Sequence, residues 1–69
     1  MLKTLIHTTT LKEANPIIKF FNLEETYNSN IYSNDKIILV VSGLSNNEIN
    51  KSLEFVFQNY QINKATFVD

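Results

Sequence analysis

Glu13 is the residue whose type and spacing most directly suggest chemistry in this 69-residue chain. It follows Thr10 by three positions, the spacing at which a hydroxyl and a carboxylate cap the first turn of a helix reciprocally. If the same carboxylate stood in a loop above a sheet, it could instead act as a general base towards a bound water. The residues alone favour the capping role.

The other reactive side chains form no catalytic pattern in the sequence. His7 is the single histidine and lies in an apolar segment, where a packed or surface role is the simpler interpretation. The Glu24–Glu25 pair is most simply solvated, near the end of a predicted helix. No glycine-rich phosphate loop, no metal-ligand spacing and no nucleophile beside a base is present in the sequence. We therefore expect no cofactor and no metal site.

Composition narrows the class of partner. Six lysines stand against seven carboxylates, so the formal net charge of −1 gives no electrostatic reason to expect nucleic acid or an anionic membrane. Arginine, the usual bidentate clamp for phosphate, is absent, and so is cysteine. No apolar run approaches the roughly 20 residues that span a bilayer, and the apolar start is too short for a signal peptide. We expect a soluble, cytoplasmic protein.

The element that must organise any site is the run Ile37–Val41, which consists of five consecutive apolar residues. An unbroken run of Ile, Leu and Val predicts a strand that is buried on both faces, as in α/β sheets. Such sheets bind ligands beyond the carboxyl ends of their strands, which here means Ser42 to Asn46. Gly43, the only glycine, allows the backbone to turn sharply there or another group to come close.

The residues that precede Ile37 predict a first strand over residues 2–8, and a helix follows that strand. Pro16 leaves the start of the helix open, either directly after Thr10 or nearer Glu13 with a loop before it. The face expected to be buried recurs at helical spacing and consists of Leu11, Ala14, Ile17, Ile18 and Phe21.

The remaining elements follow from turn and capping signals. Residues 24–30 are polar and predict a loop, residues 31–33 predict a strand, and Asn34–Asp35 predicts a hairpin turn with left-handed backbone. Ser45 and Glu48 repeat the capping spacing and begin a second helix. Its predicted buried face consists of Ile49, Leu53, Val56, Phe57 and Tyr60. Residues 61–64 are expected to return the chain to a last strand over 65–69.

The predicted order is therefore βαββαβ, an α/β fold with a mixed central sheet. We expect two short helices to be too few to cover both faces of the central strand, and the predicted order ends on a new strand. We therefore expect residues 1–69 to be the amino-terminal portion of a larger domain. The alternative is a small, self-contained α/β module that acts by self-association.

The segment from Thr8 to Phe21, the dipeptide Ile31–Tyr32 and the run from Ile37 to Leu44 together resemble the amino-terminal part of the nucleoside phosphorylase and nucleosidase superfamily. Methylthioadenosine/adenosylhomocysteine nucleosidases are well-known members. The resemblance covers the whole chain in element order and implies a three-layer fold. One difference is that Ser45–Asn46 stands where the family pattern has Gly-Lys.

The resemblance also implies a function and a set of site residues. Glu13 matches the glutamate that activates the attacking water in the nucleosidase branch. Gly43 and Leu44 match residues that shape the nucleoside pocket. The implied activity is cleavage of the N-glycosidic bond of a purine nucleoside, by hydrolysis or by phosphorolysis. The implied partners are the purine nucleoside and, in a homo-oligomer, further copies of the chain. The family residues that bind ribose and protonate the purine have no match here, so the chain alone is expected to be inactive.

Overall fold

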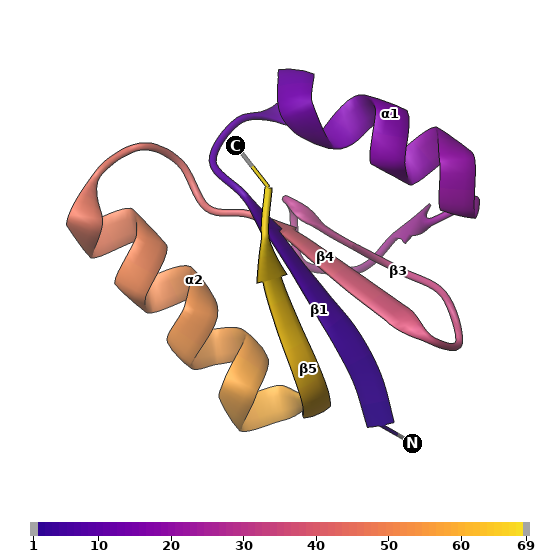
Figure 1. The fold of residues 1–69 in the computed structure, drawn as a ribbon. Helices are drawn as coiled ribbons and strands as arrows, with labels where there is room; N and C mark the ends of the chain where they lie inside the picture. The colour runs from indigo at the N-terminus through magenta and orange to yellow at the C-terminus, as the bar shows by residue number, and fades with distance from the viewer. Residues whose placement is uncertain (1, 69) are drawn as a thin grey trace.

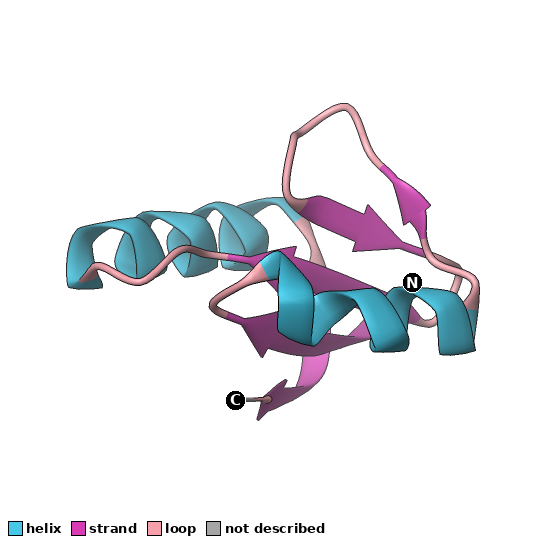
Figure 2. Ribbon diagram, turned by 90° about the horizontal axis from the view of Figure 1, so that it is seen from above, coloured by secondary structure: helices cyan, strands magenta, loops and turns pink. Residues whose placement is uncertain are grey.

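The computed structural model describes residues 2–68, which form a five-stranded sheet between two helices (Figure 1). Seen from above, one helix lies on each side of the sheet (Figure 2). The chain is thus an α/β protein of three layers. In chain order the elements are β1 (Leu2–Thr8), α1 (Leu11–Phe21), β2 (Glu24–Glu25), β3 (Ile31–Ser33), β4 (Ile37–Val41), α2 (Asn46–Asn59) and β5 (Gln61–Phe67).

The sheet is mixed, with the strand order β2-β3-β4-β1-β5. β4 is the central strand, and β1 beside it pairs in parallel with β4 on one side and with β5 on the other. β3 pairs antiparallel with both β4 and β2. The carboxyl ends of β1, β4 and β5 therefore meet at one edge of the sheet, as the predicted mixed α/β sheet requires.

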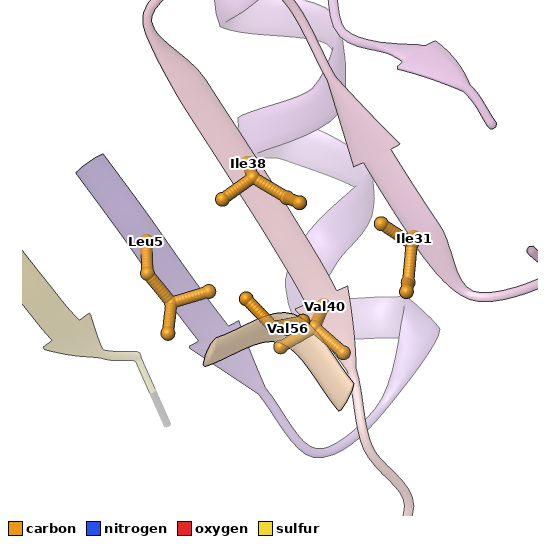
Figure 3. Close-up of a cluster of buried hydrophobic side chains, with 5 residues drawn as sticks. All are labelled: Leu5, Ile31, Ile38, Val40 and Val56. Atoms are coloured by element: carbon orange, nitrogen blue, oxygen red, sulfur yellow. The ribbon is translucent and has the colours of Figure 1, made fainter. Parts of the chain in front are cut away.

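β4 is buried on both faces, as its unbroken apolar run predicts. Ile38 and Val40 join Val56 of α2 in one core cluster, which also contains Leu5 and Ile31 (Figure 3). Leu39 and Val41 point to the opposite face, where they join Ala14 of α1 and Leu23. Two helices are thus enough to cover both faces of β4, and the expectation that they would be too few is wrong for this strand.

The helix α1 begins directly after Thr10, which is its N-cap residue. Of the two starting points that Pro16 left open, the earlier one is therefore correct, and Pro16 lies inside the helix. Only the middle of the predicted apolar face is covered: Ala14 is fully buried, whereas Leu11 and Phe21 at the two ends are exposed.

The predicted face of α2 is wrong at Phe57. Val56 is fully buried at the centre of the face, but Phe57 is 53% exposed, and Phe55 packs against the core in its place. Phe55 and Phe57 flank Val56 on opposite sides of the helix. The Phe55 side lies over Ile31 and Val40, whereas the Phe57 side lies towards β5, where the sheet ends.

Two strand boundaries and the conformation of one turn differ from those that the sequence predicts. Glu24–Glu25 pairs with Tyr32 and Ser33 as the short strand β2, where a loop was expected. The β3–β4 turn forms as predicted but without left-handed backbone, because the side chain of Asn34 accepts from the N–H groups of Lys36 and Ile37. β5 begins at Gln61, four residues earlier than predicted, since its pairing with β1 starts there and continues to Phe67, with one register shift at Asn63.

Candidate functional site

The carboxyl edge of the sheet joins the turn after β1 to the turn after β4. The N–H of Ser42 donates to the carbonyl of Thr8 at 2.9 Å, and the N–H of Gly43 donates to the carbonyl of Thr9 at 3.0 Å. These bonds continue the parallel pairing beyond the strands. The two segments that carry the predicted site residues therefore lie side by side.

Glu13 lies at this edge and holds the first turn of α1. Its Oε1 accepts from the hydroxyl of Thr10 at 2.7 Å, from the N–H of Thr10 at 3.2 Å and from the hydroxyl of Thr9 at 3.2 Å. The predicted capping contact between Thr10 and Glu13 is thus present. Thr9 also links two of the predicted site residues, because its hydroxyl bonds Glu13 while its carbonyl bonds Gly43.

Gly43 is required by the structure for two reasons. Its φ of +91° lies in the region that L side chains rarely adopt, and a Cβ built on it would lie 2.7 Å from Oε2 of Glu48. That carboxylate caps α2: its Oε1 accepts from the hydroxyl of Ser45 at 2.9 Å, and the Glu48 N–H donates back to Ser45 Oγ. The glycine therefore allows the cap of α2 to pack against the end of β4.

Leu44, the third predicted site residue, follows Gly43 directly but takes no part in the link through Thr9. Its side chain is 75% exposed and lines neither of the hollows beside β4 and β5. The structure thus brings Glu13 and Gly43 to one edge, joined through Thr9, and leaves Leu44 in solvent.

One pair of functional groups was missed by the sequence analysis. Nε2 of His7 lies 2.7 Å from Oγ of Ser42, and the two residues are only 8% and 5% exposed. A signal for this pair does exist in the sequence. Side chains two apart on a strand share a face, so Leu5 and His7 of β1 lie on the same face as Ile38, Val40 and then Ser42. Recognising it required the pairing of β1 with β4.

Burial sets the charge state of this histidine. Desolvation lowers the pKa of His7 below its ordinary value of 6.5, so the imidazole is neutral at neutral pH. The ring of Phe67 packs beside it, with the ring centroids 4.9 Å apart at 58°. In the tautomer that carries its proton on Nδ1, the neutral ring accepts the hydrogen bond of the Ser42 hydroxyl.

Two hollows lie beside α2, one on each side of it. The first, of about 380 Å³, lies between α2 and the loop before β3, and Ser42, Glu48, Lys51 and Ser52 are among its lining residues. The second, of about 210 Å³, is mainly apolar and is lined by His7, Phe57 and Phe67 among others. The His7–Ser42 pair therefore connects a polar hollow with an apolar one.

Other kinds of site have less support in the structure. Within residues 2–68, no group of three or more His, Asp or Glu side chains lies close enough together to hold a metal ion. Neither helix of the described chain has the length and apolar character that crossing a bilayer requires. Comparison of the chain with protein-family models, with curated protein sequences and with solved structures gave no match.

Proposed function

We propose that this chain is part of a purine nucleoside-cleaving protein, a nucleosidase or a phosphorylase, in which Glu13 is the general base. The observation that carries the proposal is the link through Thr9, which bonds both Glu13 and Gly43 at the carboxyl edge of the sheet. This edge is where α/β sheets bind ligands. The resemblance of the segments around Glu13 and Gly43 to the nucleosidase superfamily supplies the substrate class.

The contacts of Glu13 suit a positioned carboxylate. Three donors from Thr9 and Thr10 converge on Oε1 and fix the orientation of the group relative to the sheet edge. A general base has to stand within hydrogen-bond reach of the water that it activates, and a fixed carboxylate meets that requirement better than a mobile one. In this proposal the capping bonds and the catalytic role belong to the same side chain.

In this proposal, residues outside this 69-residue sequence bind the ribose and the purine. The isolated chain is therefore expected neither to cleave purine nucleosides nor to gain thermal stability from them at millimolar concentration. A ligand that binds the folded state must raise its stability by mass action, so thermal unfolding with inosine or adenosine is a direct measurement. A clear rise in Tm would contradict this part of the proposal.

The gene provides the first test. Reading the nucleotide sequence past the codon for Asp69 shows whether an open frame continues. A frame that continues into a strand and further acidic residues supports the proposal. Unrelated sequence after a stop codon contradicts it and favours a self-contained module.

The second test is made on the protein that such a frame encodes. Glu13→Gln should lower release of the purine base by about a hundredfold or more and leave nucleoside binding largely intact. Ser45→Ala is the matched control, since it removes the equivalent capping bond at the start of α2 and leaves the contacts of Glu13 in place. The control should lose stability and retain turnover. Retained turnover in Glu13→Gln would leave Glu13 with the capping role alone.

A self-associating module is the second candidate function, and the edge strand β5 favours it. β5 ends the sheet, and its outer edge pairs with no other strand of the described chain. Most of its side chains are exposed, with Phe67 at 55% and Phe57 of α2 nearby. Unprotected edges of this kind pair readily with other strands.

Sedimentation of the purified chain tests this candidate. If a second copy pairs with β5, the chain sediments as a dimer at micromolar concentration, and Phe67→Lys converts it to a monomer. Phe20→Lys is the matched control, because Phe20 is even more exposed but lies on α1. A monomer at every concentration would exclude the self-associating module.

A further inference from the structure

The hydroxyl of Ser42 has three hydrogen-bond partners within reach. Ser42 Oγ lies 2.7 Å from Nε2 of His7, 3.1 Å from the carbonyl oxygen of Gly43 and 3.4 Å from that of Thr8. The tautomer of His7 decides the direction of the shortest contact, and we assign the imidazole proton to Nδ1, so that Nε2 accepts from the hydroxyl. This is the arrangement in which a histidine removes the proton of a serine as the serine attacks a carbon atom.

The surroundings of His7 keep it neutral and hold its ring. The side chains that line the hollow around it carry no charge, and they are those of Leu5, Leu53, Phe57, Ala65, Thr66 and Phe67. Burial among them lowers the pKa of His7. Packing against Phe67 fixes the plane of the ring. The imidazole is therefore in its basic form and is oriented towards Ser42.

The backbone places Ser42 between a strand and a helix. It follows β4 directly, Gly43 then takes the left-handed conformation, and α2 begins at Asn46. Serine nucleophiles of α/β-hydrolases also stand at a sharp strand-to-helix turn at the carboxyl edge of a sheet. In those enzymes the nucleophile itself takes the strained conformation, whereas here the next residue takes it.

The hollow beside Ser42 gives a substrate a place to bind. Its volume of about 380 Å³ is at the small end of the range for ligand pockets. Ile31 and Val40 provide apolar wall, and Lys51 lines the same hollow. An ammonium group there would stabilise the negative charge that develops on a carbonyl oxygen under attack. The hollow thus suits a short acyl group with a polar leaving group.

We propose that Ser42 is a nucleophile, activated by His7, that accepts the acyl group of small esters. Ser42 Oγ forms a bond to the acyl carbon as its proton passes to Nε2 of His7. The ester C–O bond breaks, and the leaving alkoxide or phenoxide takes up that proton. Water then attacks the acyl carbon and gives a proton to Nε2 of His7. The bond between the acyl carbon and Oγ breaks, His7 returns that proton to Oγ, and the carboxylic acid leaves.

Covalent labelling of the folded 69-residue chain tests this proposal. The chain is incubated with an alkyl fluorophosphonate and, separately, with p-nitrophenyl acetate, and intact mass and peptide mapping locate the adduct. We expect one phosphonyl group on Ser42 and a burst of p-nitrophenolate that matches one acetyl group per chain. The labelling rate should increase with pH as His7 loses its proton. A folded chain with no adduct on Ser42 overturns the proposal, and so does an adduct on another residue only.

Two variants show whether Ser42 is labelled because His7 activates its hydroxyl or only because the reagent can reach it. His7→Phe keeps a buried ring and removes the base, so labelling of Ser42 should slow by about a hundredfold or more. Ser33→Ala removes a hydroxyl from β3, outside the lining of this hollow, and should leave the rate unchanged. Circular dichroism of each variant establishes that it is folded. Labelling of Ser42 at an equal rate in folded His7→Phe also overturns the proposal, and the wild-type mapping remains decisive if that variant does not fold.

Discussion

Gly43 and Glu48 are in such close contact that no side chain fits between them. A Cβ on Gly43 would lie 2.7 Å from Oε2 of Glu48 and 2.9 Å from its Cδ. The glycine at the end of β4 and the capping carboxylate of α2 therefore act together. The contact explains why the turn between these two elements contains the only glycine of the chain.

Gly43→Ala is expected to lower the free energy of unfolding by about 1–3 kcal/mol, because it adds both backbone strain and this contact. In a Glu48→Ala background the contact is gone and only the strain remains, so the same substitution should cost less. Urea unfolding of the four proteins in this double-mutant cycle measures the difference. Equal costs in both backgrounds would show that Glu48 does not restrict position 43.

The two-sided burial of β4 predicts the effects of substitution at two adjacent positions. Ile38→Ala and Leu39→Ala should each cost about 2–5 kcal/mol, because each empties a fully buried site on one face of the sheet. A strand that is buried on one face only would tolerate alanine at one of these two adjacent positions. Leu44→Ala is the control and should change the free energy of unfolding by less than about 0.5 kcal/mol, since its side chain is exposed.

If the alanine variants do not fold, Ile38→Val is the gentler probe, with an expected cost of about 0.5–1.5 kcal/mol. Chemical denaturation followed by circular dichroism provides these values. A negligible effect at either Ile38 or Leu39 would contradict burial on that face.

Asn34 is expected to stabilise the β3–β4 turn through its side chain. Its Oδ1 accepts from the N–H groups of Lys36 at 2.9 Å and Ile37 at 2.8 Å, and its Nδ2 donates to the carbonyl of Phe21 at 3.1 Å. Asn34→Ala should cost about 1–3 kcal/mol, since the N–H groups lose their acceptor. Asn34→Asp keeps that acceptor and should cost less. Asp35→Ala, in the same turn but exposed, is the control for thermal unfolding.

Stability should depend on pH through His7. The folded-state pKa of His7 is lowered by burial, so the unfolded chain binds its proton more readily than the folded chain does. The contribution of neutral His7 is therefore fully present above the unfolded pKa and is lost as pH falls through that value towards the folded pKa. Between about pH 8 and about pH 6 most carboxylates stay ionised, so the slope there reports on His7.

Urea unfolding across this range is the measurement, and the His7→Phe variant is the control. The wild-type free energy of unfolding should decrease as pH falls, whereas that of the variant should stay nearly constant. Equal slopes in the two proteins would show that His7 is not buried as a neutral group.

Several features could be predicted from the sequence because they depend on neighbouring residues. The five apolar residues of β4 indicate a two-sided strand, and the Ser45/Glu48 spacing locates the start of α2. The Thr10/Glu13 spacing gives one of the two starts that Pro16 leaves open for α1. Those capping bonds join groups three residues apart, so local geometry decides them. The α/β class and the mixed sheet follow from these elements and the short β3–β4 turn.

Other features depended on which strands are neighbours. Phe57 fits the periodic face of α2 but lies where the sheet ends at β5, so Phe55 packs in its place. The contact between His7 and Ser42 joins residues 35 positions apart and exists only because β1 pairs in parallel with β4. The chain's own spacing thus determined its helices, its central strand and the capping role of Glu13. Only the tertiary structure decided which polar groups meet, because the register between distant strands places one buried side chain against another.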